Sequence, residues 1–269
     1  MPTSLLFAVY GALAVAALCW ILSLFTRECS WVDRIWSIVP ALYVGWFAWC
    51  ADFADARLVL MTVLVTAWGA RLTFNFARKG GYAPGGEDYR WEVLRKRMSP
   101  AMFQLFNFGF IALYQNVLLL LITLPAWAAL EHGAGTPLNA IDVVAALLFL
   151  AFLAGETIAD EQQWRFHQDK HARKARGERV EHEFLTNGLF RFSRHPNFFC
   201  EQGMWWAIYL FSVAAGAGWA NWTIVGAVLL SLLFQGSTTF TEQITVSKYP
   251  AYREYQKTTS RLLPMPPRA

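Results

Sequence analysis

Residues 4–25 read SLLFAVYGALAVAALCWILSLF, a run of 22 residues without one charged side chain. A hydrocarbon core about 30 Å thick is crossed by about 20 consecutive apolar residues of α-helix. No basic segment precedes the run, and it is longer than the apolar core of a signal peptide. The stretch therefore predicts a retained transmembrane helix near the start of the chain.

The rest of the chain repeats this pattern. Of its 269 residues, 56% are hydrophobic and only 16% are charged, whereas a soluble domain carries about 25% charged residues. Six further apolar blocks follow, at residues 35–50, 58–76, 103–130, 141–158, 198–215 and 219–240. The sequence thus predicts an all-α integral membrane bundle of about seven transmembrane helices, and it excludes disordered, fibrous and disulfide-scaffold proteins.

Lysine and arginine are distributed unevenly among the connecting segments. If these segments alternate between the two sides, residues 26–34, 77–102, 160–197 and the tail from residue 241 share one side and hold 21 of the 23 basic residues. Arg71 lies near the same end of the third block, so only Arg57 is left on the other side. The positive-inside rule then predicts a multi-pass protein with its N-terminus outside and its C-terminus inside. We expect any active site to open on the cytoplasmic face.

Cysteines and known nucleotide motifs contribute little. The four cysteines, Cys19, Cys29, Cys50 and Cys200, show no CxxC or metal-ligand spacing, so they are interpreted as buried thiols and no metal site is predicted. No GxGxxG or P-loop pattern is present. A bound nucleotide would therefore need an all-helical site, and no nucleic-acid partner is expected.

Polar side chains recur at helical spacing within the apolar blocks. Those that share one predicted helix face are Ser231, Gln235, Thr238 and Glu242 in the last span, Glu156, Asp160, Gln163 and His167 at the end of the fifth, and Asn197 and Glu201 in the sixth. Polar groups in a span usually face the bundle interior. A single Thr or Gln more often ties helices together, but a carboxylate at depth requires a partner or a function. The pattern predicts a polar chamber open to the cytoplasm.

The densest cluster is GLFRFSRHPNFFCE at residues 188–201. Pro196 suits the first turn of a helix, whose free amides and positive dipole would face Arg191, Arg194 and His195. This arrangement is typical of a phosphate site, although the cations could instead bind lipid head groups and His195 could be a helix cap. The acidic stripes on neighbouring blocks favour a nucleotide, with Asn197 and Glu201 reaching its ribose or amide.

Together with ETIAD at 156–160, KYPAYREYQ at 248–256 and RLLP at 261–264, this cluster resembles the steroid 5-alpha-reductase-like family of integral membrane, NADPH-dependent reductases. The resemblance is strongest over residues 155–264. It implies that residues 141–269 bind NADPH and that residues 1–130 form a lipid-facing substrate cavity. The residues expected to bind the cofactor are Arg71, Asp160, Gln163, His167, Arg191, Arg194, His195, Asn197, Glu201, Glu242, Lys248, Tyr252 and Tyr255.

The resemblance also implies a reaction. Asp33 falls at the acidic position that polarises the ketone oxygen in the steroid members, and the tyrosine position carries Trp68, which leaves Tyr114 as the alternative donor. The implied reaction reduces a carbon–carbon double bond conjugated to a ketone, with a 3-oxo-4-ene steroid as the expected substrate. That substrate would enter from the bilayer, where membrane lipids surround the protein. A polyprenol or a fatty enoyl compound also fits.

The main alternative is a membrane methyltransferase of the isoprenylcysteine type. Such enzymes share an Arg-His-Pro segment at a helix start and use S-adenosylmethionine, which has no phosphate to neutralise. The basic loop before residue 191 and the polar residues Asn197 and Glu201 favour NADPH. A non-catalytic sterol-binding protein would not need converging polar stripes, and no internal repeat or broken-helix pair indicates a transporter.

Overall fold

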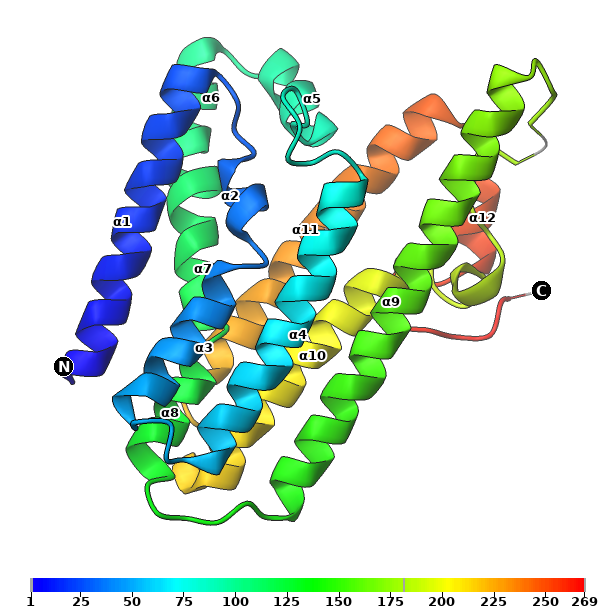
Figure 1. The fold of residues 1–269 in the computed structure, drawn as a ribbon. Helices are drawn as coiled ribbons and strands as arrows, with labels where there is room; N and C mark the ends of the chain where they lie inside the picture. Colours follow the sequence, from blue (N-terminus) through cyan, green and yellow to red (C-terminus); the bar gives the residue numbers. More distant parts are fainter. Residues whose placement is uncertain (1, 181, 269) are drawn as a thin grey trace. The chain divides into compact units, whose positions relative to one another are not determined.

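The computed structural model describes residues 2–180 and 182–268. In this part of the chain it contains helices and no strand, which confirms the all-α prediction (Figure 1). The chain divides into two compact units. Unit 1 consists of Met1–Leu147 and Trp206–Leu230, and unit 2 consists of Leu148–Trp205 and Ser231–Ala269. The expected division into a substrate part and a cofactor part stays a prediction.

Within the described residues, five helices are long and apolar enough to cross a membrane. They are Thr3–Thr26 (α1), Ala56–Arg78 (α4), Pro100–His132 (α6 to α8), Ala140–Ala175 (α9) and Ile224–Lys248 (α11). Two more predicted blocks form shorter apolar helices, Val39–Cys50 (α3) and Pro196–Ser212 (α10), and α10 continues into a π-helix, Val213–Ala217 (η3). A membrane-embedded bundle is thus supported, while the number of spans and their orientation stay predictions.

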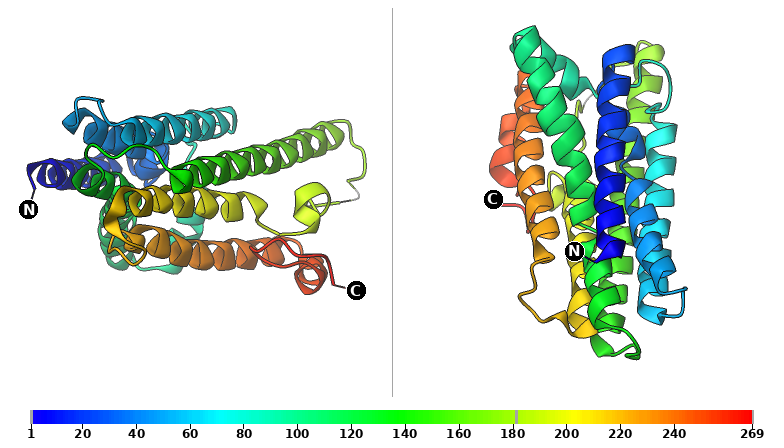
Figure 2. Two further views of the ribbon diagram at one scale, coloured as in Figure 1. Left: turned by 90° about the horizontal axis from the view of Figure 1, so that it is seen from below. Right: turned by 90° about the vertical axis from the view of Figure 1, so that its left-hand side faces the viewer.

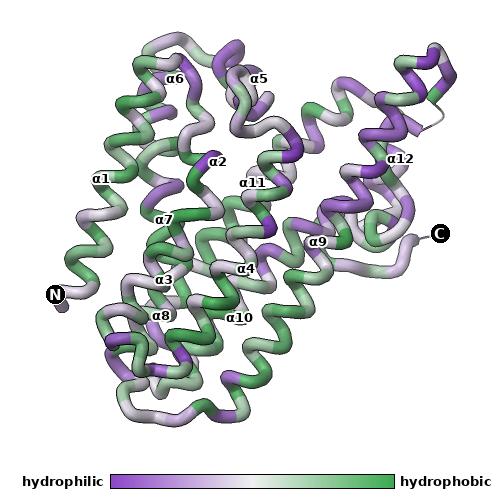
Figure 3. Tube along the Cα trace, in the orientation of Figure 1, coloured by the Kyte–Doolittle hydropathy of each residue, from purple (hydrophilic) through white to green (hydrophobic). Residues whose placement is uncertain are grey.

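Helix α9 continues well beyond the apolar block at residues 141–158. Its hydropathy changes from apolar to strongly polar toward Ala175 (Figure 3). The added residues are rich in Gln, Lys and Arg, which are good helix formers, and they form ion pairs one turn apart, Arg165–Glu161 at 2.7 Å and Arg173–Asp169 at 2.8 Å. The polar end of α9 therefore belongs to the same helix as its apolar part.

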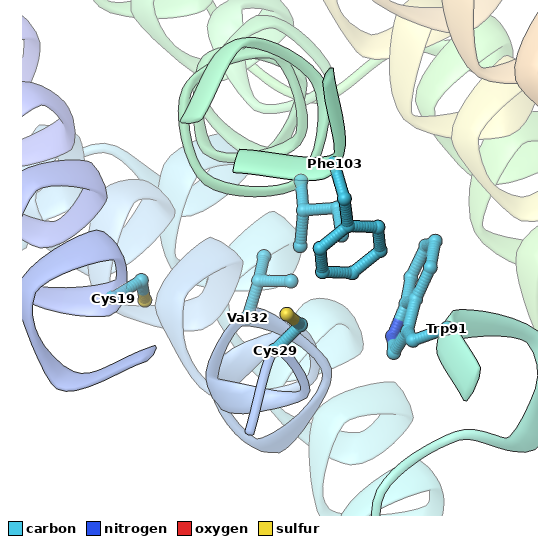
Figure 4. Packing of buried hydrophobic residues seen from close by; sticks show 6 residues of the cluster. Cys19, Cys29, Val32, Trp91 and Phe103 are labelled. Carbon is cyan, nitrogen blue, oxygen red and sulfur yellow. The ribbon is translucent and has the colours of Figure 1, made fainter. Parts of the chain in front are cut away.

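In unit 1, α1 packs along the helical segment Pro100–His132 (Figures 1 and 2). That segment consists of α6 (Pro100–Phe106), the π-helix η1 (Asn107–Tyr114), α7 (Gln115–Leu121) and α8 (Leu124–His132). Two short helices, α2 (Trp31–Ile35) and α5 (Tyr89–Arg97), add Val32 and Trp91 to a buried cluster with Cys19, Cys29, Phe103 and Ile111 (Figure 4). This cluster surrounds the start of α2, where Asp33 lies.

Arg57, the one basic residue that the charge count leaves outside, is completely buried in unit 1. Its Nε and Nη2 donate to Asp142 Oδ1 and Oδ2 at 2.7 and 2.9 Å. Nη1 donates to Thr136 Oγ1 at 3.0 Å, and Nη2 also donates to the Pro137 carbonyl at 3.1 Å. The ion pair joins the start of α4 to the start of α9. Arg57 is therefore a structural group in the core and not a surface charge.

In unit 2, α9 and α10 pack closely through two glycines. A Cβ on Gly155 would lie 2.8 Å from Cys200 Sγ, and one on Gly203 would lie 2.6 Å from the Phe152 ring. Because the residue number rises along α9 as it falls along α10, the two helices are antiparallel. By this register the polar residues after residue 158 of α9 lie level with the first turn of α10.

Candidate functional site

The polar residues of unit 2 gather around the carboxylate of Glu242 on α11. Arg194 Nε and Nη2 donate to Glu242 Oε1 and Oε2 at 2.6 and 3.0 Å. His195 Nε2 lies 3.1 Å from Oε1, Gln256 Nε2 donates to Oε2 at 2.8 Å, and the Tyr252 hydroxyl is 3.5 Å from Oε1. The sequence-predicted residues Arg194, His195 and Glu242 are thus brought together. Arg194 and Glu242 form a buried ion pair, so the guanidinium of Arg194 is already bound to a carboxylate of the protein.

The C-terminal tail holds the segment that precedes α10. The backbone amides of Arg194 and His195 donate to the carbonyls of Ser260 and Arg261 at 2.9 and 3.1 Å, and Met265 N donates to Phe192 O at 2.9 Å. The Arg194 Nη1 group donates to the carbonyls of Gln256 and Thr259. Figure 2 shows α12 (Tyr252–Thr258) and the tail folded back beside the end of α11. The tail therefore holds residues 192–195, the segment that leads into α10, in place.

The 3-10 helix η2 (Gly188–Arg191) is attached to α9 by Gln162. Its Oε1 accepts a hydrogen bond from Leu189 N at 3.0 Å, and Phe190 packs with Ala159 of α9 in a small apolar cluster. Gly188 has φ +62°, and a Cβ there would lie 2.5 Å from Gln162 Oε1. The positive φ favours glycine at this position, and a Cβ there would push the Gln162 amide away from η2.

Gly188→Ala is expected to destabilise the protein by at least about 1–2 kcal/mol, the cost of a left-handed residue with a Cβ, and to displace Gln162. The matched control is Gly236→Ala on α11, where an added Cβ would meet no atom within 4 Å. Thermal unfolding in detergent measures both. If Gly188→Ala unfolds at the same temperature as Gly236→Ala, the attachment of η2 to α9 is not as described.

The tail residues expected to close over the cofactor, Tyr252, Tyr255 and Lys248, contact other parts of the protein. Tyr255 donates to the Phe190 carbonyl, and both tyrosine rings, Tyr252 and Tyr255, pack against Phe184. Burial raises the pKa of both phenols, with the nearby Glu242 carboxylate adding to the effect at Tyr252. Lys248 is exposed, and its Nζ lies 5.4 Å from the centre of the Tyr249 ring.

Several predicted groups in unit 2 have no protein partner among the residues that the structure describes. The guanidinium of Arg191 is exposed and unpaired, the half-buried side chain of Asn197 makes no hydrogen bond, and the buried Oε1 of Gln163 accepts none. In the first turn of α10 the amides of Asn197 and Phe198 are also unbonded within the described chain. Such donors at the start of a long helix suit an anion, so this donor set fits a phosphate-bearing cofactor.

The other predicted cofactor residues occupy different environments. Asp160 and Glu201 are buried, on α9 and α10 of unit 2. His167 is exposed, and its Nε2 lies 3.2 Å from Gln163 Nε2. Arg71 is half-buried on α4 of unit 1. Its expected contact with the cofactor therefore stays a prediction.

The candidate catalytic acid Asp33 lies in unit 1 next to the Trp91 indole, whose Nε1 donates to Asp33 Oδ2 at 3.0 Å. Burial raises the pKa of Asp33, and the neighbouring Asp88 carboxylate raises it further, against hydrogen bonds from Ser30 and Trp91 and the charge of Arg90. Asp88 also caps α5 and binds the Arg90 guanidinium, with Nη2 2.7 Å from Oδ2. The cluster thus favours the neutral acid form of Asp33, which can donate a hydrogen bond.

Tyr114, the alternative donor, is half-buried at the end of the π-helix η1. Its ring stacks on Phe110 with centroids 5.3 Å apart and an interplanar angle of 10°. Phe110 in turn stacks on Phe106 at 4.9 Å, and Phe106 lies 6.4 Å from Trp91. A row of aromatic rings thus leads from Tyr114 to the indole that contacts Asp33, and no direct contact joins Tyr114 to Asp33 in the described structure.

Gln162 and Trp91 are site residues that the sequence patterns did not single out. Gln162 adjoins the predicted Gln163 but faces η2, 27 residues later in the chain. Trp91 lies in a basic connecting segment, 58 residues from Asp33. The local signal is the group of arginines around Trp91, namely Arg90, Arg95 and Arg97.

Comparison with known proteins relates this chain to others without a described activity. Residues 19–259 match the family model DUF1295, described as a protein of unknown function. The chain is 38% identical over 258 residues to "Uncharacterized protein C594.04c" of Schizosaccharomyces pombe (strain 972 / ATCC 24843), in a match that covers 91% of this chain and 75% of that relative. No solved structure matches the chain.

Proposed function

The chain belongs to the DUF1295 family of proteins of unknown function, and from this premise we propose that it is a membrane-embedded reductase that uses NADPH. The proposed substrate is an apolar enone, a 3-oxo-4-ene steroid or a compound of similar shape. Its conjugated carbon–carbon double bond is reduced to give the saturated ketone. The family's relation to steroid 5-alpha-reductase-like membrane proteins agrees with the motifs at residues 156–160, 188–201 and 248–264.

The observation that carries the cofactor proposal is the start of α10. The unpaired Arg191 and the unbonded amides of Asn197 and Phe198 would hold a phosphate, and the Asn197 and Gln163 side chains would hydrogen-bond the polar groups beside it. Glu242 holds the Arg194 guanidinium, two residues before this turn in the chain, in a fixed position. When bound, NADPH would supply the hydride that the β-carbon of the enone accepts, and a proton taken up from the solvent would then be added to the α-carbon to give the saturated ketone.

The observation that supports the substrate side is the neutral state favoured for Asp33. A carboxylic acid held by Trp91 can donate its proton in a hydrogen bond to a ketone oxygen and stabilise the negative charge that develops there. The aromatic row from Trp91 to Tyr114 offers apolar contact to a flat substrate. Unit 1 therefore orients the enone and polarises it, and the surrounding apolar residues exclude water.

Oxidation of NADPH by the purified protein in detergent, followed by the loss of nicotinamide absorbance, tests the proposal with a 4-ene-3-one steroid as substrate. Turnover with formation of the saturated ketone is expected. If NADPH binds but neither this steroid nor a linear enone is reduced, the substrate part of the proposal is wrong while the cofactor part stands.

Asp33→Asn should lower kcat by about 100-fold or more, the usual contribution of a positioned acid, with little change in NADPH affinity. Because the raised pKa of Asp33 marks loss of its proton, wild-type kcat should be constant at low pH and fall as the pH rises through that pKa. The variant should lack this alkaline decline. Glu92→Gln is the control, since Glu92 is an exposed carboxylate on the neighbouring α5. Equal losses of kcat and NADPH affinity would remove Asp33 from the catalytic role.

A further inference from the structure

The starts of α2 and α5, with the residues just before them, lie side by side in unit 1. Three hydrogen bonds join the two segments, and each connects residues that are 58 positions apart in the chain. They run from Cys29 N to Glu87 Oε1 at 2.6 Å, from Asp88 N to Ser30 Oγ at 2.9 Å and from Trp91 Nε1 to Asp33 Oδ2 at 3.0 Å. Because the separation is constant, the two segments run in the same direction in one register.

This register holds the Trp91 indole against Asp33. Only 6% of Trp91 is exposed, and it belongs with Val32 and Phe103 to the buried cluster (Figure 4). The Glu87 carboxylate that binds the Cys29 amide also binds the Arg95 guanidinium of α5, with Nη2 2.9 Å from Oε1. The indole is therefore fixed by packing and by the hydrogen bonds between the two segments.

The chemistry of the indole decides how it meets the carboxyl group. An indole N–H is a donor only, so the oxygen that it binds, Asp33 Oδ2, has to accept. In a neutral carboxyl group one oxygen carries the proton and donates, while the other accepts. A proton on Oδ2 would meet the indole hydrogen in the 3.0 Å between Oδ2 and Nε1. The acid proton of Asp33 is therefore favoured on Oδ1.

The surroundings of Asp33 favour the neutral form that this arrangement requires. Burial raises the pKa of Asp33, and the Asp88 carboxylate raises it further, against the charge of Arg90 and the hydrogen bonds from Ser30 and Trp91. Asp33 can thus keep a proton that the indole directs to one of its two oxygens.

We propose that Trp91 is a positioning residue, which binds Asp33 Oδ2 and so leaves Oδ1 as the oxygen that donates to the ketone of the substrate. This inference rests on the proposed role of Asp33 in the reductase. It adds which oxygen carries the acid proton and which residue selects that oxygen. Trp91 acts through Asp33 and not on the substrate itself.

The infrared carbonyl band of protonated Asp33 tests the proposal without turnover. In the full chain, purified in detergent, this band is the one that Asp33→Asn removes. Trp91→Phe should move it to higher wavenumber, because a carbonyl group that loses a hydrogen bond has a stiffer bond. Trp31→Phe is the matched control and should leave the band unchanged, since Trp31 Nε1 donates to Thr26 Oγ1 at 2.9 Å and not to Asp33.

Turnover of an enone with NADPH gives a second measurement. Trp91→Phe should lower kcat by about fivefold, the value of one hydrogen bond, with NADPH affinity unchanged, and Trp31→Phe should change neither. Replacement of Trp91 by benzothienylalanine, which has sulfur in place of the N–H group at nearly the same ring size, should act like Trp91→Phe. This replacement provides the same test if the smaller Phe unfolds the protein.

Two results would overturn the proposal. One is a carbonyl band that keeps its position in both Trp91 variants. The other is a wild type from which Asp33→Asn removes no acid band at any pH at which the protein is folded. A band that moves as expected in a protein that reduces no enone would support the placement of the proton on Oδ1 and contradict the reductase.

Discussion

Glu242→Ala is expected to lower the free energy of unfolding by about 3–5 kcal/mol, the range found when one partner of a buried ion pair is removed, and to abolish NADPH binding. The Arg194 and Glu242 side chains are only 9% and 7% exposed, so the variant leaves a buried guanidinium without its carboxylate. It also frees His195 and Gln256, which share that carboxylate. Thermal unfolding and NADPH titration in detergent measure the two effects.

The control for Glu242→Ala is Glu254→Ala on α12. Glu254 pairs with Lys257 at 2.8 Å, but both side chains are exposed, and such pairs contribute little to stability. The melting temperature and the NADPH affinity of Glu254→Ala should both be close to those of wild type. A stable Glu242→Ala protein with normal NADPH affinity would show that the network around Glu242 does not organise the start of α10.

Asp142→Ala should destabilise unit 1 by a similar amount, about 3–5 kcal/mol. It leaves Arg57 buried with only the Thr136 hydroxyl and the Pro137 carbonyl as partners. In contrast with Glu242→Ala, NADPH affinity should be retained at temperatures where the variant stays folded, because the cofactor residues of unit 2 are unchanged. Thermal unfolding with and without NADPH distinguishes the two variants, because NADPH should raise the melting temperature of Asp142→Ala and not that of Glu242→Ala.

The double variant Arg57→Met/Asp142→Leu sharpens this test. Apolar residues of similar volume replace a buried ion pair at little or no cost, so the double variant should recover most of the stability that Asp142→Ala loses. Glu131→Ala, at an exposed glutamate on α8 of unit 1, should have no effect. If the double variant is as unstable as Asp142→Ala, the loss does not come from an uncompensated charge.

The membrane helices are predictable because their signal is local. An apolar block of about 20 residues specifies a span wherever it lies, and α1 and α4 each begin and end within two residues of a predicted block. Helix α11 begins five residues after the start of the predicted block at 219–240 and ends eight residues after its end. The end of α9 is missed because hydropathy marks where a helix leaves the lipid and not where the helix stops. The π-helix η1 has no comparable signal, since it depends on packing around Asn107, whose amide donates to Ser23 of α1 at 2.8 Å.

The site is only partly predictable, because its local patterns are visible in the sequence and its distant contacts are not. The cluster at residues 191–201 is contiguous, so its cations and its helix start can be found from spacing. The partners that decide how these groups are used are distant in sequence. Glu242 is 48 residues from Arg194, and Arg57 is 85 residues from Asp142. Sequence patterns identify which residues are unusual for a membrane span, but tertiary packing decides which of them neutralise one another and which, such as Asn197, make no hydrogen bond within the described chain.

A titration of the purified protein with NADPH and with S-adenosylmethionine, followed by its melting temperature, tests the central claim most directly. The proposal predicts that NADPH raises the melting temperature and that S-adenosylmethionine does not. Asn197→Ala should weaken NADPH binding by at least ~1 kcal/mol, the value of a buried hydrogen bond. A rise with S-adenosylmethionine and none with NADPH would contradict the reductase and favour a methyltransferase.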